Sequence, residues 1–332
     1  MNIMEELIRK GQAEPKRVIF PESAEPKILL AAKKALDSGI AKPILVGDIN
    51  EIQKISLDKN IDINGMRIVS NSDETLVRSC IEEYLNKECI FSEKKLTRMA
   101  QTPLNLAAMM VNKGEADAMI AGLVHTTADV ILASQSLIGL QEGISTPSSL
   151  FLMNIPGFDG PEGNLIVLSD GGVCESPSIS ELADIAITTA DTVSGLLNWE
   201  PRVAMLSYST KGSVKGEKPN FVLSALKEIK ERKPNLKVDG ELQLDAAIMP
   251  EVASKKSPDN TEVAGRANIL IVPDLNVGNI LYKSIQRFAH ADAYGPFLQG
   301  FSKTISDLSR GSSIDDIYGV IAMAVVRAQT LK

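Results

Sequence analysis

Short apolar segments alternate with longer helical patterns along almost the whole chain, and this alternation limits the fold more than any other feature. Residues 17–21 (R-V-I-F-P) form an apolar run of strand length. A helical pattern follows over residues 26–38 and ends at Gly39, and residues 43–48 form the next apolar run. This spacing predicts a strand, a helix and a second strand. The chain therefore begins with a βαβ unit.

The same alternation continues to the end of the chain. Further strands are expected over residues 66–70, 116–124, 165–170, 202–209, 237–240, 268–274 and 301–305, and helices over residues 74–85, 92–113 and 314–331. The strand segments lack polar alternation, which is typical of parallel sheets covered on both faces. The sequence therefore predicts an α/β protein with mostly parallel sheets in three-layer domains.

The length of 332 residues suits two domains or one large α/β unit. The strongest turn cluster, residues 156–163 (P-G-F-D-G-P-E-G), is typical of a hairpin or of an inter-domain crossing. We place a domain boundary shortly before this cluster, near Gly143.

Composition excludes several classes of protein. Hydrophobic residues make up 44% and charged residues 23% of the chain, as in ordinary globular domains, so neither disorder nor a fibrous structure is expected. The formal net charge of -7 argues against a broad nucleic-acid or membrane-surface footprint. Any site for an anionic ligand must therefore be local.

The cysteines and histidines do not have the spacing of a metal site. Cys80, Cys89 and Cys174 form no C-x-x-C pair, and His125 and His290 lie far apart in the sequence. No signal peptide and no apolar stretch of membrane-spanning length is visible. We therefore expect no metal, no membrane span and a reducing, cytoplasmic location.

Ligands of parallel α/β sheets collect beyond the carboxyl ends of the strands, and four such junctions are rich in polar residues. The first is residues 122–129 (G-L-V-H-T-T-A-D), where Thr126 and Thr127 could donate to an anion at a helix start. Ordinary helix capping by threonine explains the same residues equally well. His125 alone is more often a packed residue than a catalytic one.

Two junctions in the second half stay open between a functional and a structural interpretation. Residues 207–216 (S-Y-S-T-K-G-S-V-K-G) resemble a phosphate loop in composition but lack its spacing, so a solvated turn competes. In the next junction, Asp274 and Asn276 follow a strand and Arg287 lies on the following helix. A capped helix with a solvated arginine is the alternative there.

The fourth junction, residues 308–316 (L-S-R-G-S-S-I-D-D), carries the most chemistry. Arg310 offers a rigid fork of donors for phosphate oxygens, Ser309 a hydroxyl and Asp316 a candidate base. Ser313 and Asp316 also have the spacing of a helix capping box. A site for a phosphorylated substrate and a helix cap are both compatible with this segment.

Taken together, these segments resemble the phosphate acetyltransferase (phosphotransacetylase) family over nearly the whole chain. The matching stretches are residues 17–26, 40–48, 124–129 (V-H-T-T-A-D), 181–190 (E-L-A-D-I-A-I-T-T-A), 239–247 (D-G-E-L-Q-L-D-A-A), 267–280 (A-N-I-L-I-V-P-D-L-N-V-G-N-I) and 307–317 (D-L-S-R-G-S-S-I-D-D-I). Each stretch is short, and their joint order is highly specific.

The resemblance implies two α/β domains, residues 1–143 with 300–332 and residues 144–299, with an active-site cleft between them and dimerisation through the second. It implies reversible acetyl transfer between phosphate and coenzyme A in a homodimer, with coenzyme A as a co-substrate and no permanently bound cofactor. By the same resemblance, Asp316 is the base, Ser309 stabilises the transition state and Arg310 holds the phosphoryl group. The binding residues implied are Arg287, Thr126, Thr127, Lys87 and Asn276.

The sequence departs from the family pattern at several positions. Leu132 replaces an arginine often credited with coenzyme A binding, and Lys87 stands where an arginine is common. Residues 170–177 read D-G-G-V-C-E-S-P instead of D-C-A-V-N-P-N-P, and Ser312 replaces a cysteine. These changes bear on cofactor affinity and acyl preference.

Three alternatives to a phosphate acetyltransferase therefore remain. One is a phosphate butyryl- or propionyltransferase, and another is the ethanolamine-utilisation type of phosphotransacetylase. The remote alternative is a non-catalytic regulatory module of the same family, which the retention of Ser309, Arg310 and Asp316 disfavours.

Overall fold

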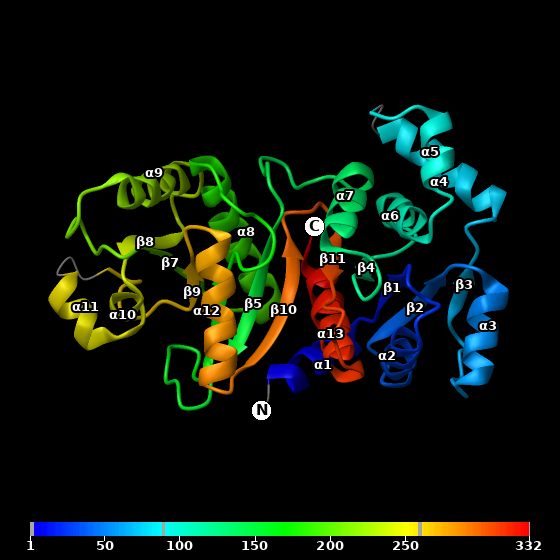
Figure 1. Ribbon diagram of the computed structural model, residues 1–332, viewed down its shortest axis with the longest axis horizontal. Helices are drawn as coiled ribbons and strands as arrows, with labels where there is room; N and C mark the ends of the chain where they lie inside the picture. The colour runs from blue at the N-terminus through cyan, green and yellow to red at the C-terminus, as the bar shows by residue number, and fades with distance from the viewer. Residues whose placement is uncertain (1–2, 88–89, 258–260, 332) are drawn as a thin grey trace. The chain divides into compact units, whose positions relative to one another are not determined.

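A computed structural model of the chain describes residues 3–87, 90–257 and 261–331 (Figure 1). Cys89 lies outside these residues. The chain divides into two compact units, Met1–Leu140 with Phe301–Lys332 (unit 1) and Gln141–Gly300 (unit 2). That residues 1–143 with 300–332 form the first α/β domain and residues 144–299 the second stays a prediction.

Unit 1 contains a five-stranded sheet in the order β11-β4-β1-β2-β3, in which every neighbouring pair is parallel. Its strands are β1 (Lys16–Phe20), β2 (Ala41–Val46), β3 (Arg67–Val69), β4 (Ala118–Ala121) and β11 (Thr304–Asp307). Its helices are α1 (Ile3–Ala13), α2 (Pro26–Asp37), α3 (Ile49–Asp58), α4 (Glu74–Lys87), α5 (Glu93–Met99), α6 (Pro103–Lys113), α7 (Thr127–Leu137) and α13 (Ile314–Thr330).

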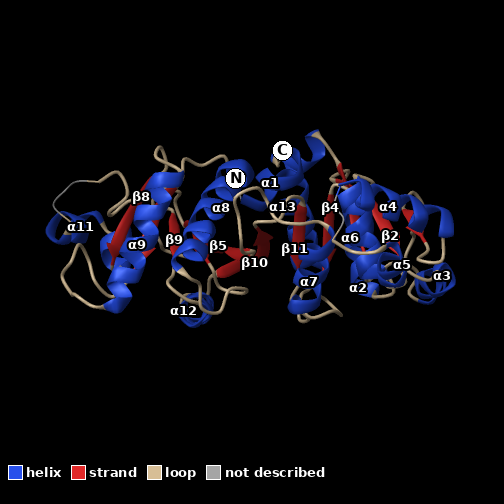
Figure 2. Cartoon of the chain, turned by 90° about the horizontal axis from the view of Figure 1, so that it is seen from above, coloured by secondary structure: helices blue, strands red, loops and turns tan. Residues whose placement is uncertain are grey.

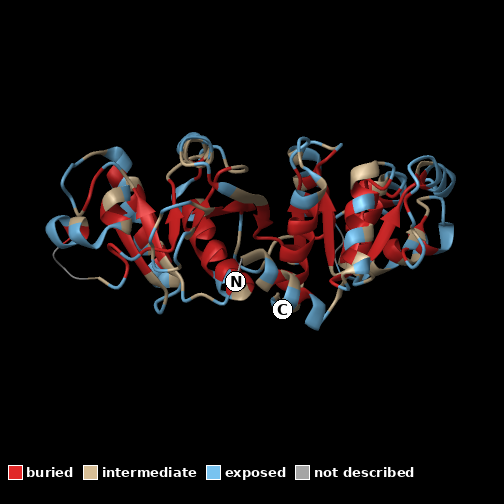
Figure 3. Cartoon of the chain, turned by 90° about the horizontal axis from the view of Figure 1, so that it is seen from below, coloured by how far each residue is buried: buried red, intermediate tan, exposed pale blue. Residues whose placement is uncertain are grey.

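Helices cover both faces of this sheet (Figure 1). Helices α2 and α13 pack on one face with α1 against α13, and α6 and α7 pack on the other with α4 against α6. Burial follows this arrangement, because β4 and the middle of α13 are wholly buried (Figure 3). The chain runs outward from β1 through β2 to β3, and β4 and β11 lie on the opposite side of β1. The strand order therefore reverses between β1 and β4.

The helix predicted over residues 92–113 is wrong in one respect, because the structure has two helices there. Helix α5 ends at Met99, and α6 begins at Pro103 with Thr102 as its cap. A proline restricts the residue before it to an extended conformation and suits the first helical position. The break at Pro103 is therefore a local property of the sequence.

Unit 2 contains a six-stranded sheet in the order β10-β5-β6-β9-β7-β8. Its strands are β5 (Ser148–Asn154), β6 (Leu165–Ser169), β7 (Arg202–Leu206), β8 (Lys237–Leu242), β9 (Ile269–Ile271) and β10 (Asp292–Gln299), and its helices are α8 (Ile179–Leu197), α9 (Glu217–Arg232), α10 (Leu244–Ile248), α11 (Pro250–Lys256) and α12 (Leu275–Phe288). Strand β5 is antiparallel to both of its neighbours, and β6, β9, β7 and β8 are parallel.

The sheet of unit 2 is also the middle of three layers (Figure 2). Helices α8 and α9 pack on one face, and α10 and α12 pack on the other. The turn cluster over residues 156–163 connects the antiparallel strands β5 and β6, so it is a hairpin and not an inter-domain crossing. The prediction of an α/β fold with mostly parallel sheets is confirmed.

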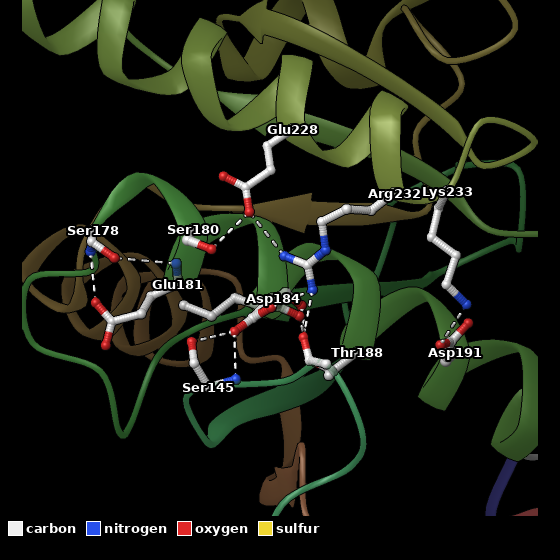
Figure 4. Close-up of polar contacts among 12 residues, drawn as sticks. Ser145, Ser178, Ser180, Glu181, Asp184, Thr188, Asp191, Glu228, Arg232 and Lys233 are labelled. Carbon is white, nitrogen blue, oxygen red and sulfur yellow. Dashed lines mark hydrogen bonds and ion pairs between the residues drawn. The ribbon is translucent and has the colours of Figure 1, made fainter.

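A polar cluster anchors the first residues of unit 2 to its helices (Figure 4). Asp184 on α8 is 1% exposed. Its Oδ2 accepts hydrogen bonds from the backbone N–H (2.7 Å) and hydroxyl (2.6 Å) of Ser145, and its Oδ1 accepts from Nη2 of Arg232 on α9 (2.6 Å). The same nitrogen donates to the carbonyl oxygen of Gly143 (2.9 Å). Residues 143–145 are therefore held against α8 and α9.

Candidate functional site

The loop that follows β11 presents Ser309 and Arg310 to solvent. The loop begins where the N–H of Leu308 donates to the carbonyl oxygen of Ala121 (2.7 Å), and the N–H of Ser312 closes a turn onto the carbonyl oxygen of Ser309 (2.9 Å). Over the described residues, the guanidinium of Arg310 has no hydrogen-bond partner. It is therefore available to an anionic ligand.

Asp316 forms the predicted capping box at the start of α13. Its Oδ2 accepts from the N–H (2.8 Å) and the hydroxyl (2.8 Å) of Ser313, whose Oγ accepts from the N–H of Asp316 (3.1 Å). Among the described residues, Oδ1 of Asp316 has no partner. One carboxylate oxygen serves the cap, and the other is left for chemistry.

Lysines of α2 add positive charge beside this loop. Nζ of Lys27 donates to the carbonyl oxygen of Ser312 (3.0 Å). Nζ of Lys34 pairs with Asp315 (2.7 Å) and lies 4.5 Å from the ring centroid of Tyr318. Asp315 neutralises Lys34, so Lys27 is the lysine that adds positive charge to that of Arg310.

The two threonines after β4 both donate to carboxylates of the protein. Thr126 is the N-cap of α7 and forms a capping box with Asp129, donating from Oγ1 to its Oδ2 (2.7 Å). Thr127 donates from Oγ1 to Oδ2 of Asp307 (2.5 Å). The capping interpretation of Thr126 is confirmed. Because both hydroxyl groups donate within the protein, they can only accept hydrogen bonds from a substrate.

Glu22, in the turn after β1, is a buried residue of this region to which the sequence interpretation gave no role. Its carboxylate accepts from the backbone N–H groups of Gly122 (3.1 Å), Leu123 (2.8 Å), Val124 (3.0 Å) and His125 (2.8 Å), and it contacts Nδ1 of His125 at 2.8 Å. Burial acts to raise the pKa of Glu22, but the hydrogen bonds from His125 and the backbone outweigh it, so this pKa lies below its usual value. The hydrogen bond to Glu22 raises the pKa of His125.

Asp307, the last residue of β11, is a second buried carboxyl group that the sequence interpretation did not single out. It is 2% exposed, and among the described residues its Oδ1 has no hydrogen-bond partner. Burial raises the pKa of Asp307 to about 6; the hydrogen bond from Thr127 opposes the shift, and the negative charge of Glu22 adds to it. Glu22 and Asp307 both lie near the ends of strands, and each belongs to a segment that matches the family. These two features of the sequence could have identified them as candidate site residues.

The other predicted site residues lie outside these loops. Nζ of Lys87, at the end of α4, donates to the carbonyl oxygen of Asn112 (2.8 Å) and pairs with Glu83 (3.0 Å). Asn276 and Arg287 are exposed residues of α12 in unit 2. Leu132, at the usual arginine position, is 65% exposed on α7.

Internal bonds tie down the loop after β7, which resembled a phosphate loop in composition. Lys211 pairs with the buried carboxylate of Asp239. The hydroxyl of Ser209 (2.6 Å) and the N–H of Gly212 (2.9 Å) donate to Oε1 of Glu241. The ammonium group of Lys211 is therefore already bound to a carboxylate within the protein.

Asp274 accepts from the N–H of Val277 (3.0 Å), so the predicted cap of α12 is also present. Beside this helix, unit 2 has an apolar hollow of about 850 Å³. Its lining includes Tyr208, Phe221, Leu244, Asn276, Val277 and Ile280.

The described residues contain no group of three or more His, Cys, Asp and Glu side chains placed to hold a metal ion. Within the same ranges, no helix has both the length and the apolar character needed to cross a membrane.

The profile of the family described as "Phosphate acetyl/butaryl transferase" matches residues 2–325. The chain belongs to this family. A phosphate acetyltransferase of Clostridium acetobutylicum is 44% identical over 333 residues, which cover 99% of each chain. The fold matches a phosphotransacetylase from Streptococcus pyogenes with a TM-score of 0.89 (34% identity, 98% of each chain). It matches the EutD phosphotransacetylase from Staphylococcus aureus with a TM-score of 0.87 (30% identity, 98% of this chain and 99% of that one).

Proposed function

We propose that this member of the family is a phosphate acetyltransferase, which transfers an acetyl group reversibly between acetyl phosphate and coenzyme A. The observation that carries this proposal is the loop after β11. It combines Ser309 with a guanidinium on Arg310 and a carboxylate oxygen on Asp316 that have no partner among the described residues. The identity to a phosphate acetyltransferase over the full chain supports the same reaction.

In the proposed mechanism, the thiol of coenzyme A attacks the carbonyl carbon of acetyl phosphate directly in a ternary complex. Arg310 binds the phosphoryl oxygens through its two-pronged donor geometry. Ser309 donates a hydrogen bond to the carbonyl oxygen as that oxygen gains negative charge. The carbon–sulfur bond forms, the carbon–oxygen bond to phosphate breaks, and phosphate leaves as a stable anion.

Asp316 accepts the thiol proton through Oδ1 in this scheme. A thiol has a reference pKa of about 8.5 and an aspartic acid about 3.9, so full transfer before attack would be uphill by roughly 6 kcal/mol. The proton therefore moves as the carbon–sulfur bond forms and the sulfur becomes more acidic. The departing phosphate then takes the proton, which restores the carboxylate.

For substrate binding we propose Arg287, Asn276, Lys87, Thr126 and Thr127, as the family resemblance implies. Lys87 keeps the positive charge of the usual arginine but not its bidentate fork. Leu132 carries no charge, so coenzyme A must be held there through other contacts. We propose that neither a metal nor a permanently bound cofactor takes part, and that no nucleic acid or membrane is a partner.

The decisive assay follows thioester absorbance with purified protein, coenzyme A and acetyl phosphate, without added metal. We expect acetyl-CoA to form, and absence of thioester at high enzyme concentration would reject the assignment in favour of a non-catalytic module. Propionyl and butyryl phosphates in the same assay test the alternatives with larger acyl groups.

Asp316→Asn should abolish turnover, whereas Asp315→Asn, one residue away and paired to Lys34, should retain it.

We also propose a homodimer that is formed through unit 2. Val277 and Ile280 on α12 are 41% and 66% exposed, and Tyr208 beside them is 55% exposed, around the apolar hollow. Monomers rarely leave large apolar patches uncovered, and a second copy of the chain would cover this one. Ile280→Lys should give a monomer by light scattering, and Leu57→Lys, a matched change of an exposed leucine on α3, should not. A monomeric wild type would contradict the proposal.

We place the enzyme in the cytoplasm. The described cysteines, Cys80 and Cys174, are free, as expected in a reducing compartment. Immunodetection in fractionated cells tests this location, and recovery of the protein outside the cytoplasm would contradict it.

A further inference from the structure

The carboxylate of Glu22 occupies the place in unit 1 where open parallel sheets usually bind a ligand. The strand order reverses between β1 and β4, and such a reversal opens a crevice beyond the carboxyl ends of the two strands. Glu22 follows β1, and the N–H groups that it binds, those of residues 122–125, follow β4. An internal anion thus takes the donors that would otherwise bind a ligand.

Because Glu22 uses these donors, an anionic substrate must bind at the neighbouring loop, the one after β11. The four N–H groups around Glu22 are already satisfied, and a second negative charge beside this buried carboxylate would be repelled. Strand β11 lies next to β4 on the side away from β1, and the loop after it carries Arg310. The guanidinium of Arg310, which has no partner within the described part of the chain, therefore follows β11, the strand next to β4.

The loops after β4 and β11 are in direct contact at their bases. A Cβ atom on Gly122 would lie 2.0 Å from Oδ1 of Asp307 and 2.6 Å from the backbone nitrogen of Leu308. The hydrogen bond from Thr127 to Asp307 (2.5 Å) joins the same two segments. Ser309 is two residues beyond Asp307, so its placement depends on this contact.

We propose that Glu22 and Asp307 are positioning residues for acyl transfer. Glu22 fixes the backbone of residues 122–125. Asp307 contacts this fixed backbone through the hydrogen bond from Thr127 and the close approach at Gly122. These contacts determine where Ser309 and Arg310 lie. This inference rests on the proposed acetyl transfer, whose reacting groups lie on the second loop.

The test compares Glu22→Gln and Asp307→Ala, which removes the acceptor of the Thr127 hydroxyl, with wild-type enzyme in the acetyl-CoA assay. Misplacement of reacting groups by an ångström lowers the rate on the order of 100-fold. We therefore expect kcat to fall between about 10- and 100-fold in each variant, with KM for both substrates changed less than about threefold. The matched control is Asp117→Asn, which alters a carboxylate at the opposite end of β4 that pairs with Arg17 (2.6 Å). It should lose stability and keep kcat.

A second comparison covers the case in which Glu22→Gln does not fold. Thr127→Val removes the donor to Asp307, and Thr127→Ser keeps it, so the serine variant should recover most of the kcat that the valine variant loses. Combining Thr127→Val with Asp307→Ala should cost little more than either change alone, because both remove the hydrogen bond between Thr127 and Asp307. Folded variants with wild-type kcat, or fully additive losses, would overturn the inference. An inactive wild type would instead reject the proposed function.

Discussion

Asp316 can be both a structural and a chemical residue because its two carboxylate oxygens have different environments. Oδ2 is held by Ser313, and Oδ1 has no partner among the described residues. A cap that fixes Oδ2 also fixes the direction of Oδ1. Helix capping and base catalysis are therefore compatible at this residue.

Removal of the cap should separate these two effects. Ser313→Ala should lower the free energy of unfolding by about 1 kcal/mol and also lower kcat, because Asp316 loses its orientation. Ser178→Ala is the matched control, since Ser178 and Glu181 form the same capping box on α8. It should cost similar stability in urea denaturation and leave kcat unchanged. Equal kcat in the two variants would contradict an orienting role for Ser313.

Asp307 should make stability depend on pH in a direction opposite to that of most acids. Its pKa is about 6 in the folded protein and about 3.9 in an unfolded chain. The folded state therefore binds the proton more tightly, so this contribution to stability is complete below pH 4 and is lost as the pH rises through 6. The loss amounts to roughly 3 kcal/mol by pH 7.

Urea denaturation of wild type and Asp307→Asn between pH 4 and pH 7 measures this contribution. The difference in unfolding free energy, wild type minus variant, should fall as the pH rises. A difference that stays constant over this range would show that Asp307 does not titrate as described.

At the scale of helices and strands, local sequence predicted some features and not others. The caps at Ser313, Thr126 and Asp274 were predicted from residue types within one helical turn. The break at Pro103 was not predicted, although the proline is an equally local signal. The antiparallel strands β5 and β10 were not predicted, because the residue pattern of a single strand does not tell its direction. Pairing with β6 and β5 decides that direction.

The helices of unit 2 also depend on the ion pair between Asp184, whose side chain is 1% exposed, and Arg232, whose side chain is 28% exposed. Arg232→Met would leave Asp184 buried without its cation, which should cost about 3 to 5 kcal/mol. Lys233→Met, next in the sequence, removes a pair with Asp191 in which both side chains are 49% exposed, and should cost less than about 1 kcal/mol (Figure 4). The single tryptophan, Trp199, lies in unit 2, so its fluorescence during denaturation reports the change. Equal losses in the two variants would contradict the role given to Asp184.

At the scale of the whole molecule, the sequence by itself determined the α/β class, the mostly parallel sheets, the family and the order of its polar segments. These properties depend on apolar periodicity and on short motifs, which are local. Only the tertiary structure decided that Lys211 is bound to Asp239, that Thr127 donates to Asp307, and that Glu22 binds the backbone of residues 122–125. Each of these contacts joins residues from 28 to 180 positions apart. Local pattern specifies which elements form, and strand order specifies which distant side chains meet at the edge of a sheet.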